Sequence, residues 1–190
     1  MKLRKINILT AIAFGAVITF AGCSKDDGAI PKNIGIEDVP VISMNYETAN
    51  ANVLTKTITF STSAAFTDNF KATQYFPNAL APTKIDISVR KGNVVSTAAT
   101  LSIATQIPNT NVKTFKADIT SLPATFTITA ADITTLFGPI SANDVYDFGP
   151  DITVNGKKYS AFPAQSYGSG SGPNGMSIIG FGEYVRYWFK

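Results

Sequence analysis

The chemistry that this sequence offers first is that of one thiol, because Cys23 is the only cysteine in the chain. The chain begins with a short basic segment, residues 1–5, followed by an uncharged apolar run, residues 6–20. Two small residues, Ala21 and Gly22, then precede Cys23. This layout is typical of an export signal with its cleavage site. The run is shorter than the ~20 apolar residues of a membrane-spanning helix, although an uncleaved membrane anchor is the alternative. We expect residues 1–22 to be removed and Cys23 to begin the mature chain.

Residues 20–23, Phe-Ala-Gly-Cys, resemble the lipobox of bacterial lipoproteins, with Phe20 where Leu is usual. The resemblance implies that the Cys23 thiol is diacylated and the new amino terminus acylated. Two or three acyl chains hold a protein on a membrane stably, whereas one holds it marginally. Residues 24–27, Ser-Lys-Asp-Asp, resemble the Lys/Asp-rich signal that sends lipoproteins of Bacteroidota to the outer face of the outer membrane; a solvated charged linker is the alternative. We therefore expect a lipid-anchored, surface-exposed outer-membrane protein that contacts the membrane through its acyl chains.

The composition excludes several kinds of chemistry. The chain has no histidine, which excludes Ser-His-Asp and Cys-His catalysis and histidine-ligated zinc. With Cys23 acylated, no thiol remains for a disulfide or a thiolate metal site. Lys2, Arg4 and Lys5 leave with the signal, so the 16 basic residues fall to 13, against 13 acidic ones, and the mature chain has a formal net charge of zero. No basic run follows the signal, so we expect no nucleic-acid partner. We also expect no cofactor.

Two patterns resemble known sites but have plainer interpretations. Ser88 and Lys91 match the Ser-x-x-Lys pattern of penicillin-recognising enzymes, which requires the start of a helix so that both side chains share a face. They lie in a segment with strand periodicity, so we interpret the match as coincidental. Asp144, Asp147 and Asp151 form a loose acidic group with oxygen ligands of the kind that calcium prefers, but their spacing matches no calcium loop. We expect no catalytic residue and no metal site.

Two further features could serve an enzyme. Glu47, Glu183 and scattered aspartates could supply the carboxylate pair of a glycoside hydrolase, but nothing in the sequence fixes their separation. The glycine-rich residues 168–175 lack the following helix and lysine of a phosphate loop, and we interpret them as a mobile loop of the kind that often carries recognition. A small hydrolase is therefore the least favoured function.

The aromatic residues near the carboxyl end allow two interpretations. In a strand over residues 184–189, Tyr184, Arg186 and Trp188 share one face, and the apolar residues between them share the other. The first interpretation is a closing strand packed on both faces, with Arg186 stacked between rings. The second is a flat platform for sugar rings, formed by Tyr184, Arg186 and Trp188 and extended by Tyr167, since aromatic faces stack on apolar and cationic groups. A second aromatic group within residues 66–76 is expected to pin a long loop.

Period-two alternation of apolar and polar residues dominates the chain after residue 39 and predicts half-buried strands. The alternating segments are residues 57–61, 84–90, 101–107, 115–119 and 125–129. Asn155-Gly156 predicts a two-residue hairpin between residues 152–154 and 157–159, and the last strand is expected over residues 182–189. Thr129, followed three residues later by Asp132, predicts the start of a short helix that Gly138 ends.

These elements predict an all-β fold: an antiparallel immunoglobulin-like β-sandwich of about seven to eight strands with one short connecting helix. A closed barrel is the main rival. We expect three parts in the chain: a cleaved signal peptide over residues 1–22, the lipidated cysteine with a tether over residues 23–38, and a single sandwich domain over residues 39–190. A flexible tether of this length spans ~20 Å.

The order of lipobox, acidic tether and sandwich segments resembles the immunoglobulin-like or fibronectin-III-like modules of Bacteroidota surface lipoproteins associated with Sus-type glycan uptake. The phrases that carry the resemblance are VPVISMNY, KIDISVRKGN, TFTITAADITTLFG, DVYDF and ITVNGKKYSAF, all within residues 39–162. The resemblance implies a non-enzymatic binding or accessory module, with a glycan or a neighbouring outer-membrane protein as partner. A structural or adhesion module without a small ligand is the alternative from a different class.

Overall fold

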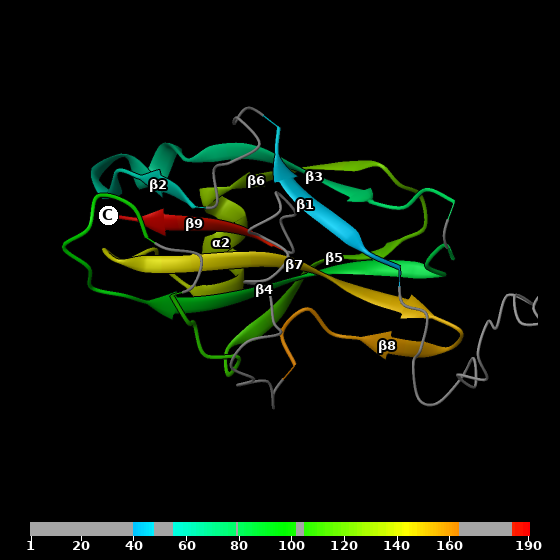
Figure 1. Ribbon diagram of the computed structural model, residues 1–190. Coiled ribbons are helices and arrows are strands. Elements are labelled where there is room, and N and C mark those ends of the chain that lie inside the picture. Colours follow the sequence, from blue (N-terminus) through cyan, green and yellow to red (C-terminus); the bar gives the residue numbers. More distant parts are fainter. Residues whose placement is uncertain (1–39, 48–54, 79, 102–104, 164–183) are drawn as a thin grey trace, which may run out of the picture. The chain divides into compact units, whose positions relative to one another are not determined.

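The computed structural model describes residues 40–47, 55–78, 80–101, 105–163 and 184–190. These residues form nine strands and two short helices (Figure 1). In chain order the elements are β1 (Ile42–Tyr46), β2 (Lys56–Ile58), the 3₁₀ helix η2 (Phe60–Ala65), β3 (Thr67–Gln74), β4 (Lys84–Asn93), β5 (Val112–Ile119), β6 (Ala124–Thr129), α2 (Ala130–Phe137), β7 (Asp144–Val154), β8 (Lys157–Tyr159) and β9 (Val185–Phe189).

The strands form two open sheets, which excludes a single closed barrel for the described part of the chain. Sheet A has the order β1-β3-β6 and is antiparallel throughout. Sheet B has the order β2-β9-β7-β4-β5. The short strand β8 also pairs with β7, at residues 152–154, whereas β9 pairs with residues 145–148 of the same strand. Only β2 and β9 pair in parallel among the described strands. The fold is therefore all-β and sandwich-like, as the periodicity predicted.

The core lies between the two sheets and is rich in aromatic rings. Phe70 of sheet A lies with its ring centroid 5.4 Å from that of Phe148 of sheet B. Tyr46 of β1 packs edge-on against Tyr187 of β9 at 5.4 Å. The inward residues of β4 that the alternation predicted, Ile85, Ile87 and Val89, are all buried in this core. Burying such side chains is the main favourable term for the fold.

The short helix and the hairpin form as predicted, and each has a local cause. The Thr129 hydroxyl accepts a hydrogen bond from Asp132 N, and the Asp132 carboxylate accepts one from Thr129 N, which completes a capping box. Gly138 ends the helix with a φ of +78° that favours glycine. At the hairpin, Asn155 and Gly156 have φ values of +51° and +75°, so that β7 and β8 pair around them.

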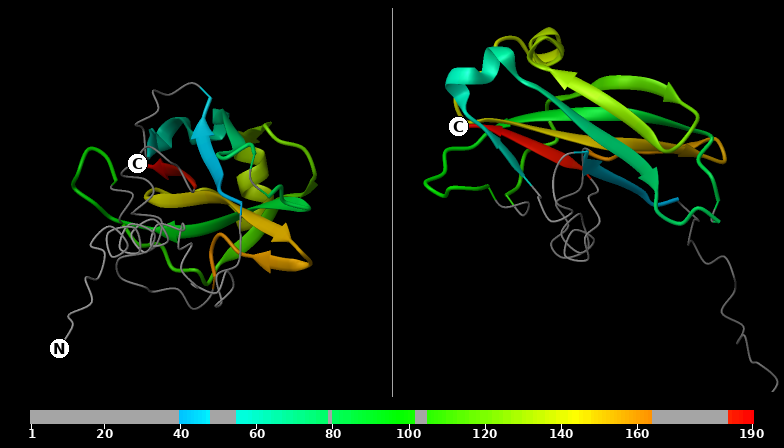
Figure 2. Two further views of the ribbon diagram at one scale, coloured as in Figure 1. Left: turned by 45° about the vertical axis from the view of Figure 1, so that its right-hand side comes forward. Right: turned by 90° about the horizontal axis from the view of Figure 1, so that it is seen from above.

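Three predictions about elements were wrong in part. Of the predicted strand 101–107, the described residues form no strand; Leu101 and Ile107 instead pack on Trp188. Residues 66–76 are mostly β3 and not a long loop, because Phe70 and Ala72 alternate inward between polar neighbours. The segment 57–61 leaves its strand at Ile58 and turns into η2, which lies beside α2 at one end of the sheets (Figure 2). Among the residues that the structure describes, no helix has both the length and the apolar character needed to span a bilayer.

Candidate functional site

The strongest concentration of charge lies on the face of sheet B that points away from sheet A. Strand register places Arg90 of β4 opposite Asp147 of β7, and Asp147 opposite Arg186 of β9. We call these three residues the charge row. Successive side chains of a strand point to opposite faces of the sheet. Arg90 is next to the core residue Val89, Asp147 is next to Phe148, and Arg186 lies between Val185 and Tyr187, so all three point away from the core.

In the charge row, one carboxylate is held between two guanidinium groups. Arg186 donates from Nε to Asp147 Oδ1 at 2.6 Å and from Nη2 to Oδ2 at 2.8 Å. Arg90 donates from Nε to the same Oδ2 at 2.8 Å. Asp147 and Arg186 are 0 % exposed and Arg90 9 %. Burial acts to lower the pKa of Arg186, but the hydrogen bonds and charge of Asp147 outweigh it, so the pKa is raised.

Aromatic rings and a second chain segment cover the charge row. The Arg90 guanidinium carbon lies 4.5 Å from the Phe162 ring centroid and 5.5 Å from that of Tyr184. The Arg186 guanidinium carbon lies 5.2 Å from the Tyr184 centroid, so Tyr184 contacts both arginines. Arg90 Nη1 also donates to Ile107 O at 3.0 Å and to Asn109 Oδ1 at 2.6 Å. The charged face of sheet B is therefore covered by Phe162, Tyr184 and the segment that contains Ile107 and Asn109.

A second ionic group lies on the same face, nearer the β7–β8 hairpin. Asp151 Oδ2 accepts a hydrogen bond from Ser88 Oγ at 2.8 Å and pairs with Lys158 Nζ at 2.9 Å. Asp86 accepts from Asp118 N at 2.9 Å. Burial acts to raise the pKa of Asp86, but the hydrogen bond from Asp118 N and the nearby Lys84 and Lys158 lower it overall. Every carboxylate in this group is tied to a named partner.

Neither short motif is assembled into a site. Ser88 faces Asp151 on the outer face, whereas Lys91 pairs with Asp144 at 2.8 Å on the inner side. The predicted acidic group is divided between the two faces of β7 in the same way. Asp144 lies on the inner face with Tyr146 and Phe148, whereas Asp147 and Asp151 lie on the outer face. Within the described ranges, no three His, Cys, Asp or Glu side chains come together to hold a metal ion.

Three of the four predicted ligand-binding residues are described, and all three are buried: Tyr184 immediately before β9, and Arg186 and Trp188 on one face of that strand. Tyr184 is 5 % exposed, and Arg186 and Trp188 are fully covered. Trp188 packs with Leu101, Ile107 and Val145 in a second apolar cluster. A sugar-stacking platform needs exposed rings, so this face corresponds to the packed closing strand, the first of the two interpretations. Tyr167, Cys23 and Glu183 lie outside the described residues.

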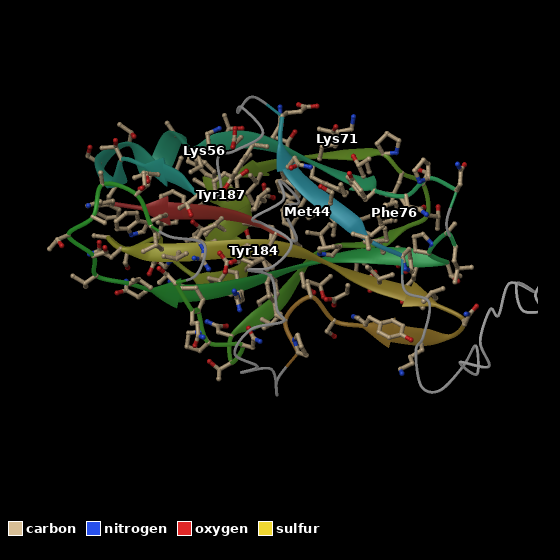
Figure 3. The ribbon with its side chains drawn as sticks, in the orientation of Figure 1. Met44, Lys56, Lys71, Phe76, Tyr184 and Tyr187 are labelled. Atoms are coloured by element: carbon tan, nitrogen blue, oxygen red, sulfur yellow. The ribbon has the colours of Figure 1, made fainter. Side chains whose placement is uncertain are left out.

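The inner face of β9 carries a polar contact that the sequence did not predict. Tyr46 Oη donates to Arg186 O and accepts from Arg186 N at 2.8 Å and Lys56 N at 3.2 Å. Burial raises the pKa of Tyr46 well above its usual value, so the hydroxyl stays protonated. Lys56 Nζ lies 2.6 Å from Asp68 Oδ1 and so joins β2 to β3 across the sandwich. Figure 3 labels Tyr187 on β9 and Tyr184, the residue that precedes this strand.

Arg90 and Phe162 are the important residues that the sequence analysis missed, and Asp147 was considered only as a possible calcium ligand and not as the partner of two arginines. A signal was present: the polar positions of residues 86–90 read Asp, Ser, Arg, and those of residues 147–151 read Asp, Gly, Asp. Antiparallel pairing of the two segments places Arg90 opposite Asp147. The covering ring of Phe162 follows a hairpin and has no such periodic signal.

Fold and site together define an all-β, sandwich-like protein with a buried ionic row under an aromatic cover. No protein family, no curated protein and no solved structure matches this chain. The functional argument therefore depends on the residues and contacts described above.

Proposed function

We propose that the protein is a lipid-anchored, non-enzymatic cell-surface module with an immunoglobulin-like sandwich, and that it binds or assists a neighbouring outer-membrane protein or a glycan. The anchor is supported by the sequence around Cys23, which resembles a lipobox with Phe20 where Leu is usual. The immunoglobulin-like assignment is supported by two largely antiparallel sheets that pack around an aromatic core.

The observation that carries the proposal is the burial of the charge row. The charged side chains of this row, Arg90, Asp147 and Arg186, bind one another. The aromatic rings of Phe162 and Tyr184 pack against the two arginines. A catalytic group must reach its substrate, whereas the charges of this row are paired with one another, and Arg90 also bonds to Ile107 and Asn109 of the covering segment. This arrangement suits a rigid module that presents its surface to a partner.

Of the two kinds of partner, the neighbouring protein is favoured over the glycan. The sugar-platform interpretation depended on exposed Tyr184, Arg186 and Trp188, and these side chains are buried within the chain. A protein partner needs no exposed aromatic platform and can use the outer surfaces of the sheets.

The anchor is tested by labelling growing cells with radioactive palmitate and by comparing the full chain with Cys23→Ser. We expect label on the unmodified protein, none on Cys23→Ser, and release of that variant from the membrane fraction. Label on Cys23→Ser, or unlabelled protein with Cys23 intact, would refute the anchor. Protection from protease added to intact cells would refute the outward orientation.

The partner is tested by crosslinking intact cells and, in parallel, by presenting the purified protein to a polysaccharide array. We expect a specific crosslinked adduct with one outer-membrane protein and no polysaccharide signal. A polysaccharide signal without an adduct would favour the glycan, and the absence of both would favour the structural module.

A further inference from the structure

The loop between β3 and β4 exposes an unusual share of large apolar side chains. Tyr75, Phe76 and Leu80 are 43 %, 55 % and 43 % exposed, and they make up three of the five large hydrophobic residues that the described surface exposes. We call these three residues the apolar tip. Single exposed hydrophobic residues are ordinary, but a group on one loop indicates a contact surface.

The apolar tip is held in place by its own loop. The Tyr75 and Phe76 rings pack edge to face with centroids 4.7 Å apart. Gln74 Nε2 donates to Phe76 O at 3.0 Å and to Leu80 O at 3.2 Å, which ties the two sides of the loop together. The exposure therefore belongs to a defined conformation.

The chain enters the sandwich beside this tip. Tyr75 N donates to Val41 O at 2.9 Å, and β1 begins at the next residue. Because β1 is antiparallel to β3, Ile42 lies opposite Gln74. The segment that leads back to Cys23 thus joins the domain at the apolar tip, whereas the carboxyl terminus lies at the other end of the strands (Figures 1 and 3). Phe60 and Val95 lie at that other end too, because Phe60 N donates to Lys190 O and Val94 N donates to Asn143 O, just before β7.

We propose that the apolar tip is a membrane-contact loop that inserts Tyr75, Phe76 and Leu80 into the interface of the lipid bilayer. The inference rests on the proposed acylation of Cys23. The sequence predicts a tether over residues 23–38, which would span about 20 Å as a random coil, so acyl chains on Cys23 would keep the tip within reach of the lipid. Aromatic side chains favour the boundary between headgroups and acyl chains.

A lipid surface fits the tip better than a protein partner or a second copy does. A specific protein interface buries at least about 1,000 Å² in total, which three side chains on one loop do not supply. A tip beside an existing anchor needs little affinity of its own, because the tether holds it at high effective concentration. Insertion of the apolar tip would orient the domain on the membrane. The end that carries the tip would face the lipid, and the end that carries η2 and the carboxyl terminus would face away from it.

The test uses Trp fluorescence in the full, acylated chain reconstituted into phosphatidylcholine vesicles with brominated acyl chains. Phe76→Trp and Leu80→Trp place a reporter on the tip, and Val95→Trp, at an 82 % exposed position at the other end, is the matched control. The native Trp188 is fully buried and gives a constant background. We expect a blue shift and bromine quenching for both tip reporters and neither for Val95→Trp.

The outcomes separate the tip from the anchor, because flotation of the same vesicles reports acylation. Floating protein whose tip reporters are quenched no more than Val95→Trp would overturn the membrane contact and leave the anchor standing. Protein that does not float would overturn both. A blue shift without bromine quenching would point to a protein partner or a second copy, and would also overturn the proposal.

Discussion

Arg186 and Asp147 form a bidentate ion pair across β9 and β7, with N–O distances of 2.6 and 2.8 Å, and both side chains are fully buried. Paired N–H donors that match two carboxylate oxygens give the strongest geometry available to an arginine. Arg90 approaches the same carboxylate from β4. One aspartate therefore joins three adjacent strands on the side of sheet B that is opposite the apolar core.

Replacing Asp147 with Asn would leave both arginines buried without their counter-charge. Removing one partner from a buried pair costs about 3–5 kcal/mol, so we expect Asp147→Asn to lower the free energy of unfolding by that amount, measured by urea denaturation. The matched control is Asp118→Asn, whose side chain is 77 % exposed and pairs with Lys84 at 2.7 Å. Exposed pairs contribute about 0–1 kcal/mol. Equal effects of the two substitutions would contradict the structural role of the charge row.

Much of the fold is predictable from the sequence because local signals there agree with tertiary packing. Period-two alternation located β4, β5 and β6, and turn chemistry located the Asn155-Gly156 hairpin. The helix after Thr129 was predicted from its capping residues and from the apolar face that follows them. In each case, the residues that define the element are also those that face the core or close the turn.

The rest of the fold depends on contacts that no local pattern encodes. β3 was missed because Asp68 and Gln74 share the parity of the inward residues Phe70 and Ala72, and these polar side chains interrupt the apolar alternation. Residues 101–107 alternate like a strand, yet Leu101 and Ile107 serve as a cover for Trp188. For the candidate site, the shared face of Tyr184, Arg186 and Trp188 followed from spacing, but its burial depends on a segment more than seventy residues away.

Tyr46 links the two sheets through its hydroxyl, which bonds to the Arg186 backbone and to Lys56 N. Tyr46→Phe would leave buried backbone groups without a partner, which costs about 1–3 kcal/mol. Tyr187→Phe is the matched comparison, because the Tyr187 hydroxyl is buried near Asp68 without a well-aligned hydrogen bond in the described structure. We expect thermal unfolding to show a clear loss for Tyr46→Phe and little or none for Tyr187→Phe. The reverse order would show that the link lies elsewhere.

Gly149 lets the segment after β8 approach sheet B closely. A Cβ at this position would lie 2.8 Å from the Ala161 Cβ and 3.0 Å from Phe162 Cζ. We expect Gly149→Ala to cost about 1–3 kcal/mol of stability through overpacking. Adding Ala161→Gly removes the nearest obstacle, so the double variant should be more stable than the sum of the two single effects predicts. Strict additivity in urea denaturation would mean that the two residues do not touch in solution.

Asp144 carries the pH dependence that is best defined by geometry. Burial acts to raise its pKa, but Lys91, Ser141 N, Asn93 and Tyr146 lower it overall below the usual 3.8. A carboxylate with a lowered pKa in the folded state stabilises the protein fully above the unfolded-state value, and this contribution is lost as the pH falls through the folded-state value. We therefore expect Asp144→Asn to reduce the free energy of unfolding at pH 7 and at pH 5 by the same amount. Below about pH 4 the unmodified protein should lose stability more steeply than the variant, so that the two urea midpoints converge. A difference that stays constant down to pH 3 would show that the Asp144 charge contributes nothing and that only its hydrogen-bonding shape matters.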